Sequence, residues 1–328
     1  MFFVSIPYLH RLWYNNSMMK HYTSLSDHLQ GQFGCKVYKL ALDGGMTCPN
    51  RDGTIGTRGC SFCAADGSGA FAQSGETVYA QIEAAKARVA AKIKNGKYIA
   101  YFQNFTNTYA PVEHLQELFS AAISHPDVAV LSVATRPDCL PEPVLALLES
   151  LNKIKPVWVE LGLQTIHEDT AKSIRRGYEL PVYDRAVTEL KKRSITVITH
   201  VILGLSGESK EQMLETVRYV GTRTDGIKLQ LLHVLRNTDL AADYELGKFR
   251  TLELEEYCHL IADCLRNLPK DVVIHRLTGD GAKKDLIAPL WSGDKKKVLN
   301  TLNRVLSEEK VQQGELTNPR KNAILLGN

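Results

Sequence analysis

Three of the seven cysteines lie close together in the stretch CPNRDGTIGTRGCSFC, which runs from Cys48 to Cys63 and also contains Cys60. Their spacing is C-x11-C-x2-C, and the residues between them are rich in Gly, Thr, Asp and Arg. Thiolates are metal ligands, and a polar loop of this kind gains order when it binds a metal centre. Three interpretations are open: free structural thiols, a structural zinc ion, or an iron–sulfur cluster held by three thiolates.

A fourth protein ligand separates the zinc interpretation from the cluster interpretation. A closed zinc site has four ligands, and Cys35 is the obvious candidate. Cys35 precedes an apolar, strand-like run that Cys48 follows, so about 23 Å of strand separates their positions. A histidine from elsewhere would have to complete a zinc site. A [4Fe–4S] cluster with three cysteines instead has one open iron, whose ligand would be a substrate or a cosubstrate.

The segments that position these cysteines alternate regularly between strand-like and helix-like sequence. Short apolar runs, typical of parallel strands buried on both faces, occupy residues 36–42, 98–103, 128–134, 157–162, 196–203, 226–232 and 272–275. Helix-like segments occupy residues 77–94, 112–124, 142–152, 181–193, 210–220 and 251–268. Strands that alternate with helices indicate βαβ units and a parallel sheet.

This alternation predicts an α/β fold, a partial (β/α) barrel of about six repeats with a C-terminal extension. No G-x-G-x-x-G follows the first strand, which disfavours a dinucleotide-binding sheet. We expect residues 1–19 to form an N-terminal extension, residues 20–275 the barrel and residues 276–328 a helical extension. Chemistry in such barrels lies at the carboxyl ends of the strands, where the three cysteines are predicted to be.

The bulk composition excludes several classes of protein. Of the 328 residues, 44% are hydrophobic and 23% are charged, as in ordinary folded domains. An odd number of cysteines favours reduced thiols in the cytoplasm over a disulfide framework. No run reaches the roughly 18 apolar residues of a membrane span, and we expect neither a secretory signal nor a membrane partner. The net charge of +4 permits a polyanionic partner without requiring one.

Five further stretches narrow the interpretation: ATRPDCL (134–140), ELGLQTIHEDTAKSIRRGY (160–178), THVILGLSGE (199–208), GIKLQLLHVLRNTDLA (226–241) and HRLTGDG (275–281). Together with the cysteines, and over roughly residues 20–310, the chain resembles the YhcC/YtqA family of the radical S-adenosylmethionine (SAM) superfamily. That family is related to the catalytic subunit of Elongator. The cysteine spacing departs from the superfamily's common C-x3-C-x2-C but matches a subgroup.

The resemblance implies that Cys48, Cys60 and Cys63 hold a [4Fe–4S] cluster whose open iron binds SAM, and that SAM is cleaved to a 5′-deoxyadenosyl radical. Gln164 and Arg176 correspond to SAM-contacting positions in relatives. An amide suits the ribose hydroxyls or the carboxylate of SAM, and a guanidinium suits its carboxylate.

Other polar residues at the predicted mouth are weaker candidates for the cofactor or the substrate. Glu160 is spaced by four from Gln164 on one strand and is expected on the same side. Gln103 and Asn107 stand where superfamily members often carry Gly-Gly-Glu. His200 lies within a strand and is either a SAM neighbour or a satisfied core histidine. Arg136 is expected either to bind substrate or SAM, or to pair with the nearby Asp138.

The resemblance also implies tRNA as the substrate, because related members act on wobble uridine and some remodel its carboxymethylaminomethyl group. An electron donor such as flavodoxin or ferredoxin is implied as a partner. Basic residues available to RNA are Arg136, Arg175, Arg176 and the runs at 191–193, 283–284, 295–297 and 320–321. The alternatives are a small metabolite or protein substrate and, in another class, a non-enzymatic zinc-binding adaptor.

Overall fold

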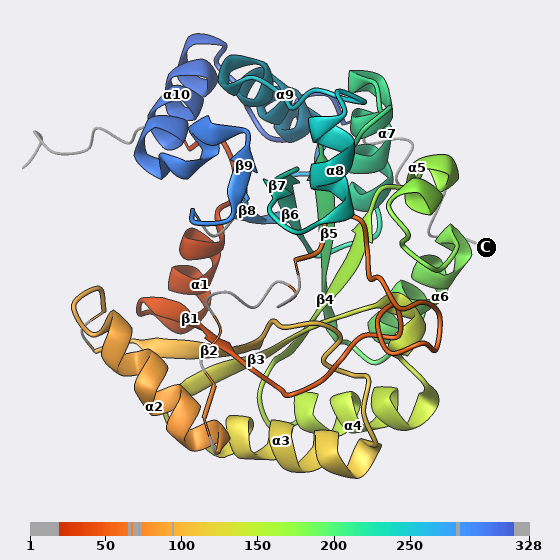
Figure 1. Ribbon diagram of the computed structural model, residues 1–328. Coiled ribbons are helices and arrows are strands. Elements are labelled where there is room, and N and C mark those ends of the chain that lie inside the picture. The colour runs from red at the N-terminus through yellow and green to blue at the C-terminus, as the bar shows by residue number, and fades with distance from the viewer. Residues whose placement is uncertain are drawn as a thin grey trace, which may run out of the picture.

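A computed structural model describes residues 20–64, 67, 72, 74–75, 77–93, 95–279 and 283–317. The expected N-terminal extension, residues 1–19, lies outside these ranges. In the described part, a curved parallel sheet forms the inner layer and helices form the outer layer (Figure 1). The fold is therefore α/β, a (β/α) half-barrel, as the alternation of strands and helices predicts.

Seven parallel strands form the main sheet, in the order β1-β2-β3-β4-β5-β6-β8. They are β1 (Val37–Leu42), β2 (Lys97–Phe102), β3 (Val128–Thr135), β4 (Val157–Gln164), β5 (Thr196–Leu203), β6 (Gly226–Leu231) and β8 (Val273–Arg276). Every adjacent pair is parallel, so all carboxyl ends meet at one rim. Each predicted apolar run corresponds to one of these strands, within two residues at either end.

Helices connect the strands and cover the outside of the sheet (Figure 1). Those that follow the main strands are α2 (Val78–Val89), α3 (Val112–Ser124), α4 (Glu142–Asn152), α5 (Glu168–Ser173), α6 (Leu180–Lys192), α7 (Lys210–Gly221), α8 (Asp239–Glu245) and α9 (Leu254–Asn267). The bounds of α3 and α4 agree with the prediction. Helix α2 ends at Val89 rather than at residue 94, because the chain must turn back to enter β2.

Local sequence explains where several helices begin. The Thr77 hydroxyl accepts a hydrogen bond from the Ala80 amide at the start of α2. Ser209 and Gln212 form a reciprocal capping box at the start of α7.

Among the described residues, no helix is long and apolar enough to cross a membrane.

Helix α1 (Leu25–Phe33) was not predicted, and it lies at the opening between β1 and β8 (Figure 1). Its Leu29 is buried in a cluster inside the barrel with Ile99, Tyr101 and Trp158. The larger core lies between the outer face of the sheet and the helices and includes Phe102 and Phe119. Helix α1 therefore supplies apolar cover to a barrel that its own strands do not close.

The C-terminal part continues beyond β8. A short antiparallel pair joins β7 (Val234–Leu235) to β9 (Leu286–Ala288), and neither strand was predicted. A 3-10 turn, η2 (Leu290–Gly293), leads into α10 (Lys295–Glu308), which packs on α9. The segment expected to be a helical extension thus also contains a strand, β9, which pairs with β7.

Candidate active site

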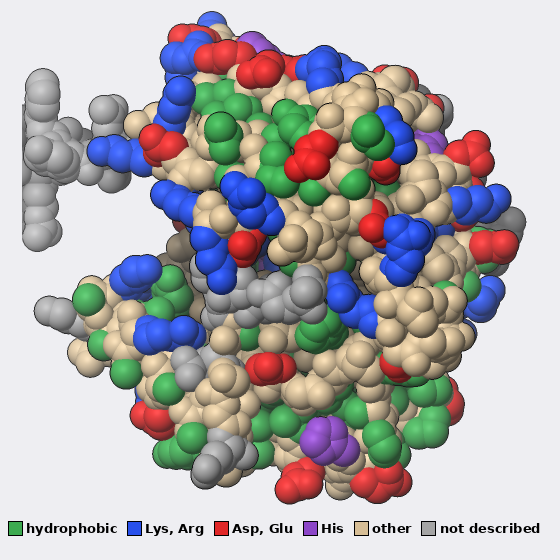
Figure 2. Space-filling view, viewed as in Figure 1, with side chains coloured by type: hydrophobic (Ala, Val, Ile, Leu, Met, Phe, Trp, Pro, Cys, Tyr) green, Lys and Arg blue, Asp and Glu red, His purple; other side chains and the backbone are tan. Residues whose placement is uncertain are grey.

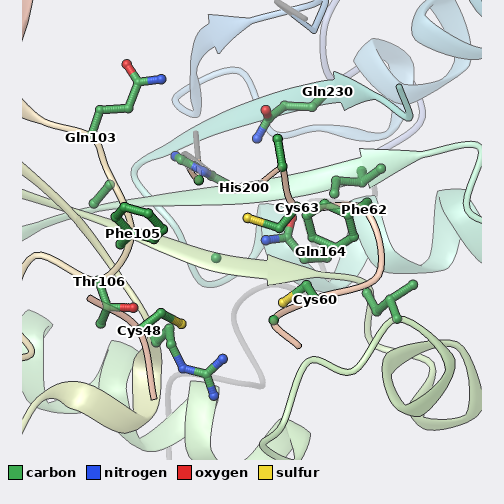
Figure 3. Close-up of a pocket in the computed structure, with 18 of the residues that line it drawn as sticks. Cys48, Cys60, Phe62, Cys63, Gln103, Phe105, Thr106, Gln164, His200 and Gln230 are labelled. Carbon is green, nitrogen blue, oxygen red and sulfur yellow. The ribbon is translucent and has the colours of Figure 1, made fainter. Parts of the chain in front are cut away.

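A cavity of about 290 Å³ opens at the carboxyl ends of the main strands. Its walls come from the loop after β1, from the ends of β2 to β6 and from the segment after β6. The cysteines Cys48, Cys60 and Cys63 all line it. Figure 3 shows their sulfur atoms directed into the same part of the cavity. The expectation that three thiols meet at one rim of the sheet therefore agrees with the geometry.

The cysteine loop is held by its own polar residues. The Asn50 amide donates to the carbonyls of Arg175 and Arg176 and approaches Cys60 Sγ at 3.5 Å. The Arg51 guanidinium donates to the carbonyls of Cys63 and Ala64. These bonds tie the loop after β1 to the loop after β4, so the cysteine positions depend on two separate segments of the barrel.

The sulfur spacing bears on which metal centre fits. In the described residues, the group of three metal-ligating side chains whose donor atoms all lie within 4.8 Å is Glu83, His125 and Asp127, not the three cysteines. One tetrahedral zinc ion with bonds of about 2.3 Å brings its thiolates to about 3.8 Å from one another. The cysteines are therefore more widely spaced than a single zinc ion requires, and the donor set suits a larger iron–sulfur cluster.

The surroundings of Cys60 change the protonation of its thiol. Burial, and then the neighbouring Cys63, raise the pKa of the Cys60 thiol to about 11, and Arg136 and Asn50 oppose that rise. At neutral pH this thiol keeps its proton unless a cation displaces it. Cys60 is consequently a poor nucleophile in the absence of such a cation.

Gln164 occupies the end of β4 in a left-handed backbone conformation, with φ of +72°. Its side chain lines the cavity together with Cys63 (Figure 3), and its buried Oε1 has no hydrogen-bond partner. Left-handed backbone in a non-glycine residue and an orphaned polar atom both cost free energy. Their coincidence at the predicted cofactor position is the pattern expected of a residue that awaits a polar ligand such as SAM.

Arg176 is more enclosed than the sequence suggested. Its side chain is 2% exposed, and its guanidinium donates to the carbonyls of Thr165 and Tyr178 and to Glu168. It reaches the cavity wall, but these partners occupy the fork that was expected to meet a carboxylate. The structure therefore gives Arg176 the role of organising the loop after β4.

Arg136 lines the cavity and forms a two-point ion pair with Asp138. This pairing is the second of the two roles expected for it. It also donates a hydrogen bond of 2.8 Å to the Arg176 carbonyl and lies over the Tyr178 ring, 5.3 Å from its centroid. Arg136 thus joins the end of β3 to the loop after β4, and its positive charge stays next to the cysteines.

Of the two candidate cofactor-binding residues after β2, one lines the cavity and the other does not. Gln103 lines the cavity. Asn107 does not: it is fully buried, and its amide donates to the carbonyls of Phe102 and Ala134. Asn107 therefore links the ends of β2 and β3 and does not reach the cavity where a cofactor would bind. The physical reason is that the loop after β2 is bonded to the end of β3, where the Asn107 backbone amide also donates to the Ala134 carbonyl.

Glu160 and His200 lie deeper in the same cavity. Glu160 is fully buried and accepts hydrogen bonds from His200 Nε2 at 2.8 Å, Lys39 Nζ at 2.7 Å and Ser132 Oγ at 2.7 Å. Burial and then the nearby Lys228 lower the pKa of His200 to about 4, so its imidazole is neutral at pH 7. Both residues belong to a buried charge network and are not isolated ligands.

Three residues of the site were missed from the sequence. Lys39 and Lys228 complete the network around Glu160, and Phe105 lines the cavity with φ of +53°. The lysines carried a readable signal, because a charged residue inside an apolar strand must find a buried partner. Phe105 carried none, because its conformation is set by the fold of the loop.

Two family models match most of the described chain after residue 51, which leaves α1, β1 and Cys48 outside the matched ranges. The model described as "Radical SAM superfamily" matches residues 52–220, and "Radical_SAM C-terminal domain" matches residues 224–308. The chain belongs to the radical SAM superfamily and is an enzyme of that class. Members of this family use a [4Fe–4S] cluster and SAM, and the donor set and the cavity described above fit both.

Within the superfamily, the chain is similar to "Uncharacterized protein YtqA" of Bacillus subtilis (strain 168), with 45% identity over 90% of this chain and 92% of that protein. It is 39% identical to "Protein YhcC" of Escherichia coli (strain K12) over 89% of this chain and 94% of that protein. The resemblance to the YhcC/YtqA family is thereby confirmed.

Two more distant similarities concern Elongator-like proteins. A "tRNA uridine(34) acetyltransferase" of Methanocaldococcus infernus is 27% identical over 46% of this chain and 28% of that protein. The solved structure of the archaeal Methanocaldococcus infernus Elp3 with an N-terminal deletion superposes with a TM-score of 0.66 at 18% identity, over 84% of this chain and 64% of that chain. This second similarity establishes a common fold.

Proposed function

We propose that this radical SAM enzyme cleaves SAM reductively and acts on a wobble uridine of tRNA in the cytoplasm, remodelling a carboxymethylaminomethyl group. The observation that carries the proposal is the meeting of Cys48, Cys60 and Cys63 at the mouth of one enclosed cavity. The tRNA part is supported by the similarity to a relative named for uridine 34 of tRNA. Superfamily membership sets aside the zinc-binding adaptor.

In this proposal, Cys48, Cys60 and Cys63 hold the cluster, and a flavodoxin or ferredoxin supplies the electron. When bound, the cluster and SAM supply a 5′-deoxyadenosyl radical that removes a hydrogen atom from the substrate. The chain itself provides position and enclosure. Gln164 offers an amide without a partner for its oxygen, and Gln103 adds a polar group across the cavity.

Two aromatic residues give the cavity flat apolar surfaces. Phe62 lies between the two cysteines of the C-x-x-C, and Phe105 lies at the loop after β2 (Figure 3). Aromatic rings stack on nucleobases irrespective of base identity, with about 1–3 kcal/mol per base. These rings are suited to adenine and to a uracil turned out of its RNA stack, as enzymes that modify bases require.

The cofactor part is tested by anaerobic reconstitution of the wild type, Cys60→Ala and the control Cys35→Ser. Cys35 lies before β1, at the opposite end of the strand from Cys48. The wild type and Cys35→Ser should be brown, bind about four irons and release 5′-deoxyadenosine with SAM and a reductant. Cys60→Ala should do none of these. A colourless wild type that binds zinc would refute the proposal.

The tRNA part is tested by mass spectrometry of tRNA nucleosides from a deletion strain and from strains complemented with the wild type or Cys60→Ala. The deletion should change the wobble-uridine profile, and only the wild type should restore it. A profile that the deletion leaves unchanged would favour the alternative, a small metabolite or a protein substrate.

A further inference from the structure

The deep end of the cavity is lined by ionisable groups from several strands. Those that meet there are Tyr101 on β2, Glu160 on β4, His200 on β5, Lys228 on β6 and Arg276 on β8, and Lys39 on β1 reaches Glu160 from the other side. Lys228 is 4% exposed, and its Nζ contacts Glu160 and donates to Tyr101 Oη at 3.0 Å. The cluster role described above uses none of these groups.

The charges around Glu160 do not balance. At pH 6, one carboxylate is shared between the ammonium groups of Lys39 and Lys228, while the imidazole of His200 is neutral. The second contact of Lys228 is a neutral phenol, because the pKa of Tyr101 lies well above its usual value. A buried cation without a carboxylate of its own is costly, and an anion placed beside it recovers part of that cost.

Strand register separates this region from the cysteines. Lys228 pairs with His200 in β5, and three further residues of β6 follow before the strand ends at Leu231. At about 3.3 Å per residue, Lys228 therefore lies about 10 Å below the end of its strand. The cysteines stand in the loop beyond the rim, so the carboxylate of SAM, a ligand of the cluster, belongs at the mouth and not at this depth.

We infer that Lys228 is a substrate-binding residue, whose ammonium, held by Glu160 and Tyr101, receives a carboxylate of the substrate at the deep end of the cavity. Of the two lysines on Glu160, Lys228 lines the cavity and Lys39 does not. The inference rests on the proposed function, because it assumes that a substrate enters through the mouth beside the cluster. It adds to that function that the substrate carries a carboxylate, which binds at Lys228.

The protonation state of Lys228 is consistent with this assignment. Burial, together with the positive charges of Lys39 and Arg276, lowers its pKa to about 7, and Glu160 opposes that change. A bound carboxylate would add a second favourable partner and keep the ammonium charged. Binding of an anion therefore favours the protonated amine of Lys228. The site consequently prefers substrates that carry an anionic group.

The first test needs no knowledge of the substrate. The cluster-loaded full chain is compared with Lys228→Met and with Lys191→Met, a control at an exposed lysine of α6, at pH 6. Replacing 100 mM sodium chloride by 100 mM sodium acetate should raise the unfolding temperature of the wild type and of Lys191→Met by about 2 °C. Lys228→Met should show no such rise. An equal response of all three proteins, or a rise with phosphate and none with acetate, would overturn the inference.

The second test separates SAM from the substrate. Equilibrium dialysis should give the same SAM affinity, within about twofold, for the three cluster-loaded proteins. With tRNA from the deletion strain, kcat/KM of Lys228→Met should fall about 100-fold, while 5′-deoxyadenosine release without substrate persists. A tenfold loss of SAM affinity would assign the subsite to SAM and overturn the inference. If tRNA is no substrate at all, the proposed function fails, and the acetate result still decides on Lys228.

Discussion

Gln164 concentrates two unfavourable features in one residue at the end of β4. Its backbone has φ of +72°, and the oxygen of its side-chain amide is buried without a partner. A left-handed non-glycine residue costs about 1–2 kcal/mol, and a buried unsatisfied polar atom costs a similar amount. A residue that serves only stability would not combine the two, so we expect that Gln164 is kept for ligand binding.

Gln164→Gly should therefore stabilise the protein and weaken the cofactor site. We expect the free energy of unfolding in urea to rise by about 1 kcal/mol, because glycine adopts positive φ freely and the orphaned oxygen is removed. SAM affinity of the cluster-loaded protein should fall about tenfold. The matched control is Asn95→Gly, at an exposed turn with φ of +53°, which should gain stability without losing SAM affinity. A destabilised Gln164→Gly with normal SAM binding would contradict this account.

Lys228 makes the stability of the protein depend on pH. In the folded protein, burial lowers its pKa to about 7, whereas in the unfolded chain it keeps the ordinary value near 10.5. Between these values the unfolded state binds more protons, so the contribution of Lys228 to the free energy of unfolding grows as pH rises. The slope is at most about 1.4 kcal/mol per pH unit.

Urea unfolding at pH 7, 8 and 9 should show this slope in the wild type and in Lys191→Met. In Lys228→Met it should be smaller by about that amount, because no amine is left to lose its proton. Curves that run parallel for all three proteins would mean that Lys228 keeps an ordinary pKa in the folded state.

At the scale of elements, helix α1 takes the place that a closing strand would have in a complete barrel. The main sheet ends at β1 and β8, and α1 contacts both. Its N-terminus is defined by Ser24, whose hydroxyl accepts from the Asp27 amide, and its C-terminus by Gly34 in a left-handed conformation. Because Leu29 reaches the inner cluster of the barrel, the packing of α1 supports the floor beneath the cavity.

Leu29→Ala should cost about 3 kcal/mol, within the range for buried leucines, because it opens a void against Trp158 and its neighbours. The control is Leu246→Ala just after α8, where the leucine is 72% exposed and the change should be within about 0.5 kcal/mol. Urea denaturation measures both. Equal effects of the two substitutions would show that α1 is not part of the cooperative core.

At the scale of the whole molecule, the charge distribution bears on the proposed RNA partner. Lys and Arg side chains gather around the hollow on the face shown in Figure 2. Lys283 and Lys284 are exposed and precede Asp285, which lines the cavity. Lys191 and Lys192 lie at the end of α6, before β5, and so at the opposite rim of the sheet. The basic run at 320–321 lies outside the described residues.

Reversing the charge of Lys283 and Lys284 together should weaken tRNA binding about tenfold or more at 50 mM salt, because each lost phosphate contact reduces counterion release. The double change Lys191→Glu and Lys192→Glu alters the net charge equally but at the far rim, and it should weaken binding much less. Filter binding across a salt series measures both. If the two variants lose affinity equally, binding follows net charge alone and the cavity rim is not the RNA interface.

The sequence alone determined the strands of the main sheet, their parallel arrangement and the grouping of the three cysteines, because each depends on local features. Continuous apolar runs mark strands buried on both faces, and parallel strands bring the loops at their carboxyl ends to one rim. The tertiary structure alone decided which partners the polar residues at this rim have. Asn107 and Arg176 turned inward to backbone carbonyls, while Lys39, Glu160 and Lys228 from three separate strands met in one network. Such meetings depend on sheet curvature and loop paths, so a lysine inside an apolar strand indicates that a buried partner exists but not which residue it is.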